Sequence, residues 1–255
     1  MERILYFDCI CGVSGDMTLA ALLDLGLDKD KFLTEINKLN MNDEFEIVIK
    51  NKQENGINGT NVCVNIKEHT HEHSHGEDHH HHHHRHLSDI HKIIDDAEIS
   101  DKSKEIAKNI FMQVATAEAK VHASTIDKVH FHEVGATDSI VDIVGCAILI
   151  DMLDVDKIYC SSVPLGSGFV KCDHGIIPVP APATIEILKE AKVKINSVKG
   201  ETTTPTGAAI VKTLSDGFLD DIEFEIHSIG YGMGDKKFEI PNMLRLILGQ
   251  KKKRA

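Results

Sequence analysis

The pattern of apolar positions along the first thirty residues predicts the start of an α/β fold. Residues 3–8 form a short apolar run that predicts a buried strand, and a glycine-containing loop follows it. Apolar residues then recur at helical spacing from Met17 to Leu25, and Gly26 ends the predicted helix. The order of strand, glycine loop and helix is the opening of an α/β unit.

Two segments with strict alternation predict a β-hairpin. In residues 44–50 and 60–66 every second residue is apolar, as expected for strands with one buried face. The sequence N-G-I-N-G at residues 55–59 is typical of a turn between such strands.

The rest of the chain continues the mixture of helices and strands. Ser88 is predicted to cap a short helix, and Ser100 is predicted to cap a longer helix that reaches about Val121. The other predicted elements are a strand at 128–132, a helix at 138–153, a strand at 157–163, a Gly/Pro-rich loop at 164–183, helices near 184–191 and 206–215, and strands near 222–229 and 243–248. The segment from 128 to 163 is interpreted as a second βαβ unit.

Together these elements predict a single α/β domain over residues 1–250, with a mixed sheet built from βαβ units and a β-hairpin. A histidine-rich stretch at residues 69–86 contains no hydrophobic residue, so we expect a disordered insertion there. Residues 251–255 form a short basic tail.

Composition narrows the class of protein. The chain has 255 residues with 42% hydrophobic and 27% charged residues, which is ordinary for a globular protein. Its formal net charge of −12 argues against nucleic acid as a partner. No apolar stretch is long enough to span a membrane, the N-terminus does not resemble a signal peptide, and the six cysteines are scattered. These features predict a cytoplasmic protein with no membrane partner.

The histidine tract is the clearest candidate for metal binding. Twelve of the 17 histidines lie between His69 and His91. Imidazole is a common ligand for nickel, copper and zinc. A purification tag or a neutral low-complexity loop is the alternative, but the tract is internal and begins with an alternating H-x-H pattern. The predicted metal ligands are His69, His71, His73, His75, His79, His80, His81, His82, His83, His84 and His86.

The loop D-C-I-C-G-V-S-G-D at residues 8–16 follows the first predicted strand. Backbone amides at the start of a helix favour a phosphate, and the carboxylates could hold a metal beside it. The residues predicted to bind a cofactor here are Gly12, Ser14, Gly15 and Asp16. The loop lacks the G-K-[ST] ending of a Walker motif, and a tight strand–helix connection is the equally simple alternative.

The segment H-F-H-E-V-G-A-T-D-S-I-V-D is a second candidate site. His130 and His132 lie on one side of the predicted strand, and Glu133 follows. Asp138 and Asp142 are four residues apart and share a helix face. Such residues at the C-terminal end of a strand suit a metal or acid–base site. Alternatively, Asp138 caps the helix and Asp142 pairs with a lysine.

Two further segments are candidates. His174, in C-D-H-G, could act in a site or could be a turn residue. In T-T-T-P-T-G-A-A, Thr204 is predicted to cap a helix with Pro205 at its first position. The amides near Thr204, Thr206 and Gly207 could then bind a phosphate, although an ordinary capped helix explains the same pattern.

The motifs taken together resemble the LarC family of nickel insertion proteins. The matching strings, in order, are Y-F-D-C-x-x-G-V-S-G-D-M, F-H-E-V-G-A-T-D-S-I-V-D-I-V-G, H-G-I-I-P-V-P-A-P-A-T, T-P-T-G-A-A and G-Y-G-M-G…P-N-M-L-R. They run from Tyr6 to Arg245, and a His-rich insertion between the first two is also characteristic of the family.

This resemblance implies nickel delivery into pyridinium-3,5-bisthiocarboxylic acid mononucleotide, which makes the nickel-pincer cofactor of lactate racemase. Such an insertase is a lyase-class nickel chelatase. Forming the product needs a source of Ni²⁺, a phosphate pocket, and a group that removes the ring proton as the nickel–carbon bond forms. We expect the tract to be the source. The predicted catalytic residues are His132, Glu133, His174, Asp138 and Asp8.

The sequence departs from the family pattern in two places. Cys11 stands where the family is expected to have serine. Full family members also continue into a second domain that binds CTP with Mn²⁺ or Mg²⁺, whereas this sequence ends ten residues after Arg245. The resemblance therefore predicts that this C-terminal LarC part is absent here and is a required partner, with the lactate racemase apoprotein as a further partner.

Two other functions remain open from the residues alone. A nickel or zinc storage module would use the histidine tract without catalysis. A metal-dependent phosphohydrolase would be built on the carboxylates of Asp8 and Asp138.

Overall fold

The structure is a computed structural model and describes residues 1–67, 85–131, 134–172 and 175–252. The predicted disordered insertion at 69–86 lies outside the described residues except for Arg85 and His86.

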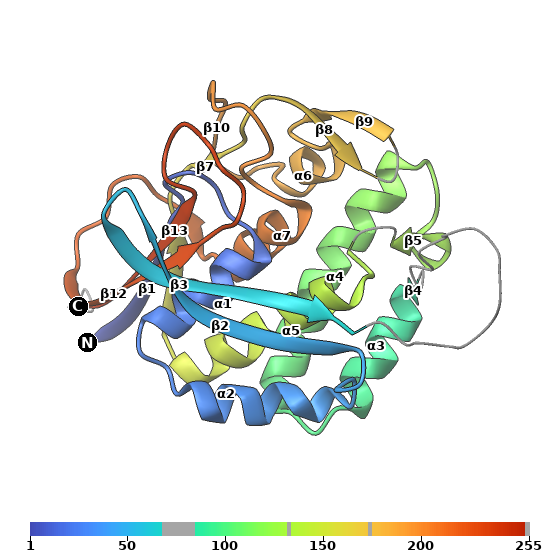
Figure 1. Cartoon of the computed structure of the whole chain (residues 1–255), viewed down its shortest axis with the longest axis horizontal. Coiled ribbons are helices and arrows are strands. Elements are labelled where there is room, and N and C mark those ends of the chain that lie inside the picture. The colour runs from blue at the N-terminus through green and yellow to red at the C-terminus, as the bar shows by residue number, and fades with distance from the viewer. Residues whose placement is uncertain (68–84, 132–133, 173–174, 253–255) are drawn as a thin grey trace.

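A mixed sheet of seven strands forms the centre of the described fold (Figure 1). In order across the sheet, the strands are β11 (Gly217–Phe218), β6 (Lys157–Cys160), β1 (Glu2–Asp8), β13 (Met243–Lys251), β12 (Glu225–Met233), β3 (Ile57–Ile66) and β2 (Phe45–Glu54). Strands β11, β6 and β1 are parallel to one another, as are β12 and β3, and the other neighbours are antiparallel. The predicted α/β class and mixed sheet are confirmed.

Helices pack against this sheet and against one another. Helix α1 (Gly15–Asp24) contacts β3, β12 and β13, and α5 (Thr137–Leu153) packs on α1. Helix α4 (Asp101–Val121) packs on α5 and on α7 (Pro205–Leu214). The remaining helices are α2 (Lys29–Ile36), α3 (Leu87–Asp96), α6 (Pro182–Ile187) and the short 3-10 helices at Asn37–Leu39 and Ile126–Lys128.

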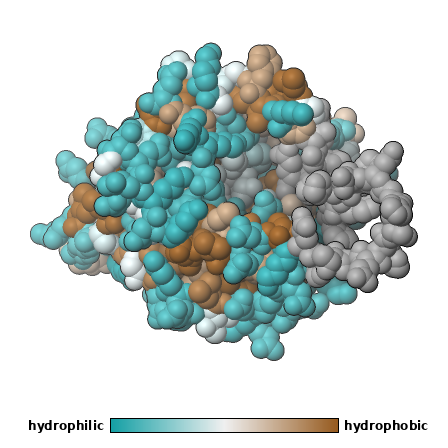
Figure 2. Space-filling view, in the orientation of Figure 1, coloured by the Kyte–Doolittle hydropathy of each residue, from teal (hydrophilic) through white to brown (hydrophobic). Residues whose placement is uncertain are grey.

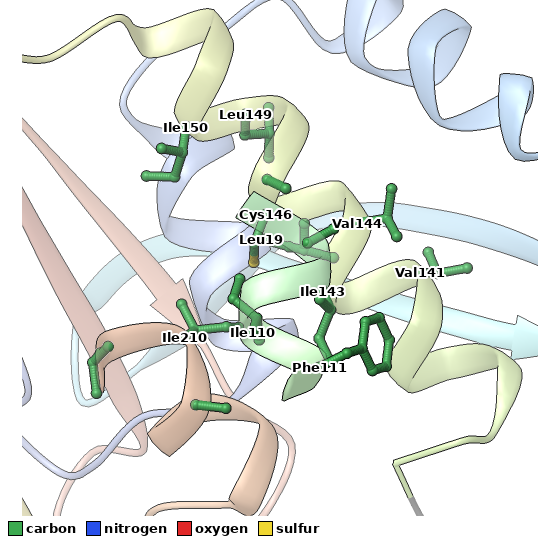
Figure 3. Packing of buried hydrophobic residues seen from close by; sticks show 14 of the residues in the cluster. Leu19, Ile110, Phe111, Val141, Ile143, Val144, Cys146, Leu149, Ile150 and Ile210 are labelled. Carbon is green, nitrogen blue, oxygen red and sulfur yellow. The ribbon is translucent and has the colours of Figure 1, made fainter. Parts of the chain in front are cut away.

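The core lies between these helices. Leu19 of α1, Ile110 and Phe111 of α4, and Ile210 of α7 surround α5, as Figure 3 shows. Helix α5 is buried on nearly all sides, which explains why its sequence is apolar without a polar stripe. The molecular face in Figure 2 is mainly hydrophilic, with hydrophobic patches between the polar side chains. Among the described helices, none is long and apolar enough to cross a bilayer.

The predicted hairpin is confirmed, with longer strands than the alternation indicated. Strands β2 and β3 pair antiparallel from Phe45 opposite Ile66 to Glu54 opposite Ile57. The turn is the dipeptide Asn55–Gly56, and both residues have positive φ, at 49° and 81°. This is the backbone that a two-residue turn requires and that Asn-Gly adopts readily.

The second predicted βαβ unit is wrong. Strand β5 (His130–Phe131) pairs with β4 (Arg85–His86) in a separate two-stranded sheet, and β6 joins the main sheet beside β1. The residues before α5 are therefore not at the C-terminal edge of the main sheet. A strand of only two residues has no periodicity, and its paired residues lie 44 and 46 positions away along the chain.

Of the two helix caps predicted here, Ser100 is confirmed and Ser88 is wrong. Ser100 caps α4 as predicted, because its hydroxyl accepts the Ser103 N–H at 3.0 Å. Helix α3 begins at Leu87, before Ser88, and the Asp89 carboxylate accepts the His86 N–H at 2.9 Å. The predicted loop at 164–183 contains a hairpin of β8 (Gly168–Cys172) and β9 (Gly175–Val179), while β7 (Val163–Pro164) pairs with β10 (Val193–Lys194).

Candidate functional site

Two loops that were each predicted to bind a cofactor lie against each other at the C-terminal end of β1. Residues 9–14 connect β1 to α1, and residues 202–204 lead into α7. The Thr204 N–H donates to the Val13 carbonyl at 3.1 Å, and the Val13 N–H donates to Thr203 Oγ1 at 3.3 Å. The two predicted cofactor-binding segments therefore form one junction.

Glycines make this junction possible. A Cβ atom on Gly12 would lie 1.9 Å from the Thr202 carbonyl oxygen, and one on Gly207 would lie 2.1 Å from the Val13 carbonyl oxygen. Both distances are far inside van der Waals contact, and the atoms met belong to the backbone. Gly12 and Gly207 are thus required for the close approach of the two loops, whether or not they also contact a ligand.

Replacing Gly207 by alanine tests this packing. Alanine would stabilise an uncrowded helical position by up to about 1 kcal/mol. Here the added methyl group should separate the loops and lower the free energy of unfolding by about 2–3 kcal/mol, as overpacking does. Urea denaturation measures the change.

Gly217→Ala is the matched control, because its Cβ atom would meet nothing closer than 3.7 Å. A Gly207→Ala protein as stable as the Gly217→Ala protein would show that the loops are not held together by this contact.

Asp8, a predicted catalytic residue, is held by an arginine. The side chain lies at the end of β1, where Arg245 Nε donates to Asp8 Oδ2 at 2.9 Å and the Arg245 terminal nitrogen donates to the same oxygen. Arg245 is in β13, directly opposite Asp8 in the strand pair. The ion pair with Arg245 gives Asp8 a structural role. The catalytic role of Asp8 stays a prediction.

Asp16 lies in the first turn of α1. The Ser14 hydroxyl donates a hydrogen bond to Asp16 Oδ1, and Ser14 is the N-cap residue of the helix. Burial raises the pKa of Asp16, and the negative charge of Asp235 raises it further, whereas the Ser14 bond opposes the shift. Asp16 therefore carries a carboxylate that is more basic than an ordinary aspartate.

Asp142, which the sequence analysis placed with Asp138 in a candidate metal or acid–base site, projects from α5 towards the same helix end. A Cβ atom on Gly15 would lie 2.4 Å from Asp142 Oδ2, so only glycine leaves room for this carboxylate. Asp142 Oδ1 is inaccessible to solvent and has no hydrogen-bond partner among the described residues, so the partner lysine considered above is not found there. Burial raises the pKa of Asp142 well above its usual value, and the charges of Asp16 and Asp138 add to the effect.

The raised pKa of Asp142 predicts a specific pH dependence of stability. The folded state favours the protonated carboxyl, so its contribution is greatest at low pH and is lost as the pH rises above about 4, the unfolded value. Asp142→Asn lacks this titration. Denaturation between pH 4.5 and 8 should therefore show wild-type stability falling relative to the variant as the pH rises.

Asp96→Asn serves as the control, since Asp96 is exposed and is not among the groups that shift the pKa of Asp142. If the wild-type and Asp142→Asn proteins keep a constant stability difference across this range, Asp142 is not held in the acid form by its surroundings.

The other predicted residues that the structure describes have clear structural partners. Thr204 caps α7 by accepting the Gly207 N–H at 3.2 Å, with Pro205 at the first helical position, as predicted. Thr206 is buried. Asp138 lies in the first turn of α5, where its Oδ1 accepts the Ser139 N–H at 2.8 Å. The phosphate-binding and catalytic roles of these residues stay predictions.

The metal ligands and three catalytic candidates lie mostly outside the described residues. His132, Glu133, His174 and the tract histidines up to His84 belong to the undescribed segments. His86 is described and stands opposite His130 in the β4–β5 pair. Over the described ranges, no group of three or more histidine, cysteine, aspartate or glutamate side chains could hold a metal ion.

Sequence reasoning also missed an ion pair around Arg85. The Arg85 guanidinium contacts Glu44 Oε2 at 2.7 Å and lies within hydrogen-bond distance of Gly135 and Thr137. These partners are 41–52 residues away along the chain. No local pattern could have identified them.

Comparison with known proteins decides the family. A family model described as "Nickel insertion protein" matches residues 5–255. The chain belongs to the nickel insertion protein family. The match includes the junction of the two loops, the Asp16–Asp142 region and the β4–β5 pair. No solved structure matches the chain.

Relatives with curated names are similar over nearly the whole chain. A protein from Clostridium kluyveri named "Pyridinium-3,5-bisthiocarboxylic acid mononucleotide nickel insertion protein" is 54% identical over 251 residues, covering 98% of this chain and 63% of that protein. One with the same name from Clostridium acetobutylicum is 54% identical over 269 residues, covering 97% and 64%. A "Putative nickel insertion protein" from Dictyoglomus thermophilum is 48% identical over 248 residues, covering 97% and 61%. The chain thus spans somewhat under two thirds of the length of these relatives.

Proposed function

We propose that this chain delivers Ni²⁺ into pyridinium-3,5-bisthiocarboxylic acid mononucleotide and so takes part in making the nickel-pincer cofactor of lactate racemase. The observation that carries the proposal is the family match over residues 5–255 together with two clostridial relatives of that name at 54% identity. This chain covers 63–64% of these relatives, and the proposed activity includes a contribution from the part of them that is not matched here.

The chemistry of the chain is consistent with this reaction. Thiocarboxylate sulfur atoms and a ring carbon form a soft ligand set that suits square-planar nickel. The histidine tract would supply the nickel, since imidazole is a common ligand for this metal. His132, Glu133 or His174 would remove the ring proton, and Asp8 and Asp138 would support them.

The junction of the two loops would receive the mononucleotide. Gly12, Ser14, Gly15 and Asp16 stand at the start of α1, and the residues from Thr204 to Gly207 stand at the start of α7. Backbone amides at helix starts favour phosphate. Asp16 places a carboxylate in the first turn of α1, so we assign the phosphate to the α7 end and the cationic pyridinium ring to the α1 end.

The additional part of the longer relatives would bind CTP with Mn²⁺ or Mg²⁺ and would complete the lyase-class insertase in the cytoplasm.

Activation of lactate racemase apoprotein tests the proposed function of this chain. Purified chain, Ni²⁺ and the thiocarboxylated mononucleotide should give active racemase when the separately made additional part and CTP are present. Activation that is unaffected by omitting this chain would overturn the proposal.

The histidine tract should bind the nickel supply without being needed for the insertion reaction itself. A variant lacking residues 69–84 removes ten of the eleven predicted histidine ligands and keeps Arg85 and His86. Calorimetry should show the loss of most of the bound nickel. Racemase activation should survive in excess nickel and fail when nickel is scarce.

A tract of equal length with serine in place of each histidine controls for chain length. Unchanged nickel stoichiometry in either variant would remove the tract from the mechanism.

Variants in the segment before α5 should lose racemase activation but keep bulk nickel binding, the opposite of the tract deletion. His132→Ala or Glu133→Ala should reduce activation at least about 100-fold at every nickel concentration, as expected when a general base is lost. Bulk nickel binding should stay nearly intact because the tract histidines remain. His227→Ala, on the exposed side of β12, is the control. Full activation by both variants would exclude this segment as the source of the base.

A further inference from the structure

Helix α1 covers one face of the inner strand β12. A Cβ atom on Gly230 would lie 2.2 Å from the Ala21 carbonyl oxygen of α1. One on Gly232 would lie 1.9 Å from the Met17 carbonyl oxygen. These two glycines therefore face the helix. Because successive residues of a strand point to opposite faces of a sheet, Ile229 lies on the face away from α1.

The face away from α1 carries a contiguous group of apolar side chains. Ile229 is directly opposite Ile247 of β13, and Ile226 is opposite Gly249. The Phe224 ring lies beside Gly249, where a Cβ atom would be 2.6 Å from it. Ile226 is 54% exposed and Ile229 is 40% exposed, whereas Ile247 and Phe224 are half-buried. We call Phe224, Ile226, Ile229 and Ile247 the outer patch.

The outer patch differs from an ordinary solvent-facing surface of a sheet. A sheet face in water usually carries polar residues. Strand β2 has this pattern, since its residues Glu46 and Lys50 are exposed. A contiguous exposed apolar patch, unlike scattered apolar residues, marks a binding surface. The outer patch is therefore suited to be the apolar centre of an interface.

The rim of the outer patch is acidic on one side. Asp221, Glu223 and Glu225 are exposed on both sides of Phe224 in the sequence. Complementary charges at the edge of an interface favour the correct partner. The partner surface that fits is thus apolar at its centre and basic at this edge.

The two outermost paired residues of β1 and β13 lie next to the outer patch. Strands β1 and β13 are neighbours in the sheet (Figure 1), and Glu2 is directly opposite Lys251. Gly249, the partner of Ile226, is two residues before Lys251. A segment attached before β1 or after β13 would therefore start close to the outer patch in either case.

The longer relatives contain such an additional segment. The match covers 98% of this chain but 63% of the Clostridium kluyveri protein, and 97% of this chain but 64% of the Clostridium acetobutylicum protein. At 54% identity over this range, we expect the same sheet in both relatives. Their additional part is tethered to it in one polypeptide. Tethering raises the effective concentration, so a contact of modest area is sufficient to hold two parts together.

We propose that the outer patch is the surface on which the additional part of the longer relatives docks, with Ile229 and Ile247 at the centre of the contact. The inference rests on the proposed function, in which that part contributes to nickel insertion. Arg245 is two residues before Ile247 on the same face of β13, and it is paired with Asp8. A part docked on the outer patch would therefore also reach the end of β1, where the junction of the two loops begins.

Calorimetry tests the docking without the insertion reaction. The full chain is titrated with the separately made additional part of the Clostridium kluyveri relative, in the absence of nickel, CTP and mononucleotide. Ile229→Glu should weaken binding at least about tenfold, because the interface would bury a carboxylate without a partner. Ile226→Glu should have the same effect, and it provides the test if Ile229→Glu does not fold.

Ile195→Glu is the matched control. Ile195 is 84% exposed and directly follows β10, which pairs with β7 in a separate sheet. The variant adds the same charge as Ile229→Glu and should bind the additional part as wild type does. Urea denaturation shows whether each variant is folded.

The outcomes separate the docking from the proposed function. The docking is overturned if wild type does not bind, if Ile226→Glu and Ile229→Glu both bind as wild type does, or if Ile195→Glu loses binding equally. A dimer of this chain alone that is lost in Ile229→Glu would assign the outer patch to a second copy and would also overturn it. Binding through the outer patch without activation of lactate racemase would instead overturn the proposed function.

Discussion

The close approach of the loop after β1 to the segment that begins α7 is the contact on which the candidate site depends. It brings together residues about 190 positions apart, with Val13 bonded to both Thr203 and Thr204. The approach is possible because Gly12 and Gly207 have no side chain at the points of contact. Once this junction is formed, the starts of α1 and α7 lie at one place, and the residues that line them can act on one ligand.

A second close contact, between α1 and α5, sets the charge distribution at the start of α1. Gly15 leaves space for the Asp142 carboxylate, which lies beside Asp16 with one oxygen inaccessible and without a partner in the described structure. Two acidic groups with raised pKa values, close to each other and to a helix start, destabilise the folded state. Perturbed carboxylates of this kind gather at functional sites, which supports the proposal that the start of α1 belongs to the ligand site.

Local sequence signals predicted several local features correctly, although not the cap of α3. Ser100 and Thr204 cap their helices because the capping residue and the helix start are adjacent in sequence. Asn55–Gly56 forms its turn because the dipeptide favours that backbone. Features set by distant contacts could not be predicted in this way. The β4–β5 pair, the Arg85–Glu44 pair and the burial of Asp142 against Gly15 all depend on how remote elements pack, and the two-residue strands show no alternation.

Mass spectrometry of the mononucleotide shows directly whether this chain takes part in placing nickel in it. The purified ligand is incubated with Ni²⁺, this chain, the additional part of the longer relatives and CTP, and with each component omitted in turn. We expect a product that contains one nickel ion in place of protons of the ligand and that forms only when this chain is present. Equal formation of the nickel-containing product without this chain, or none in the complete mixture, would contradict it.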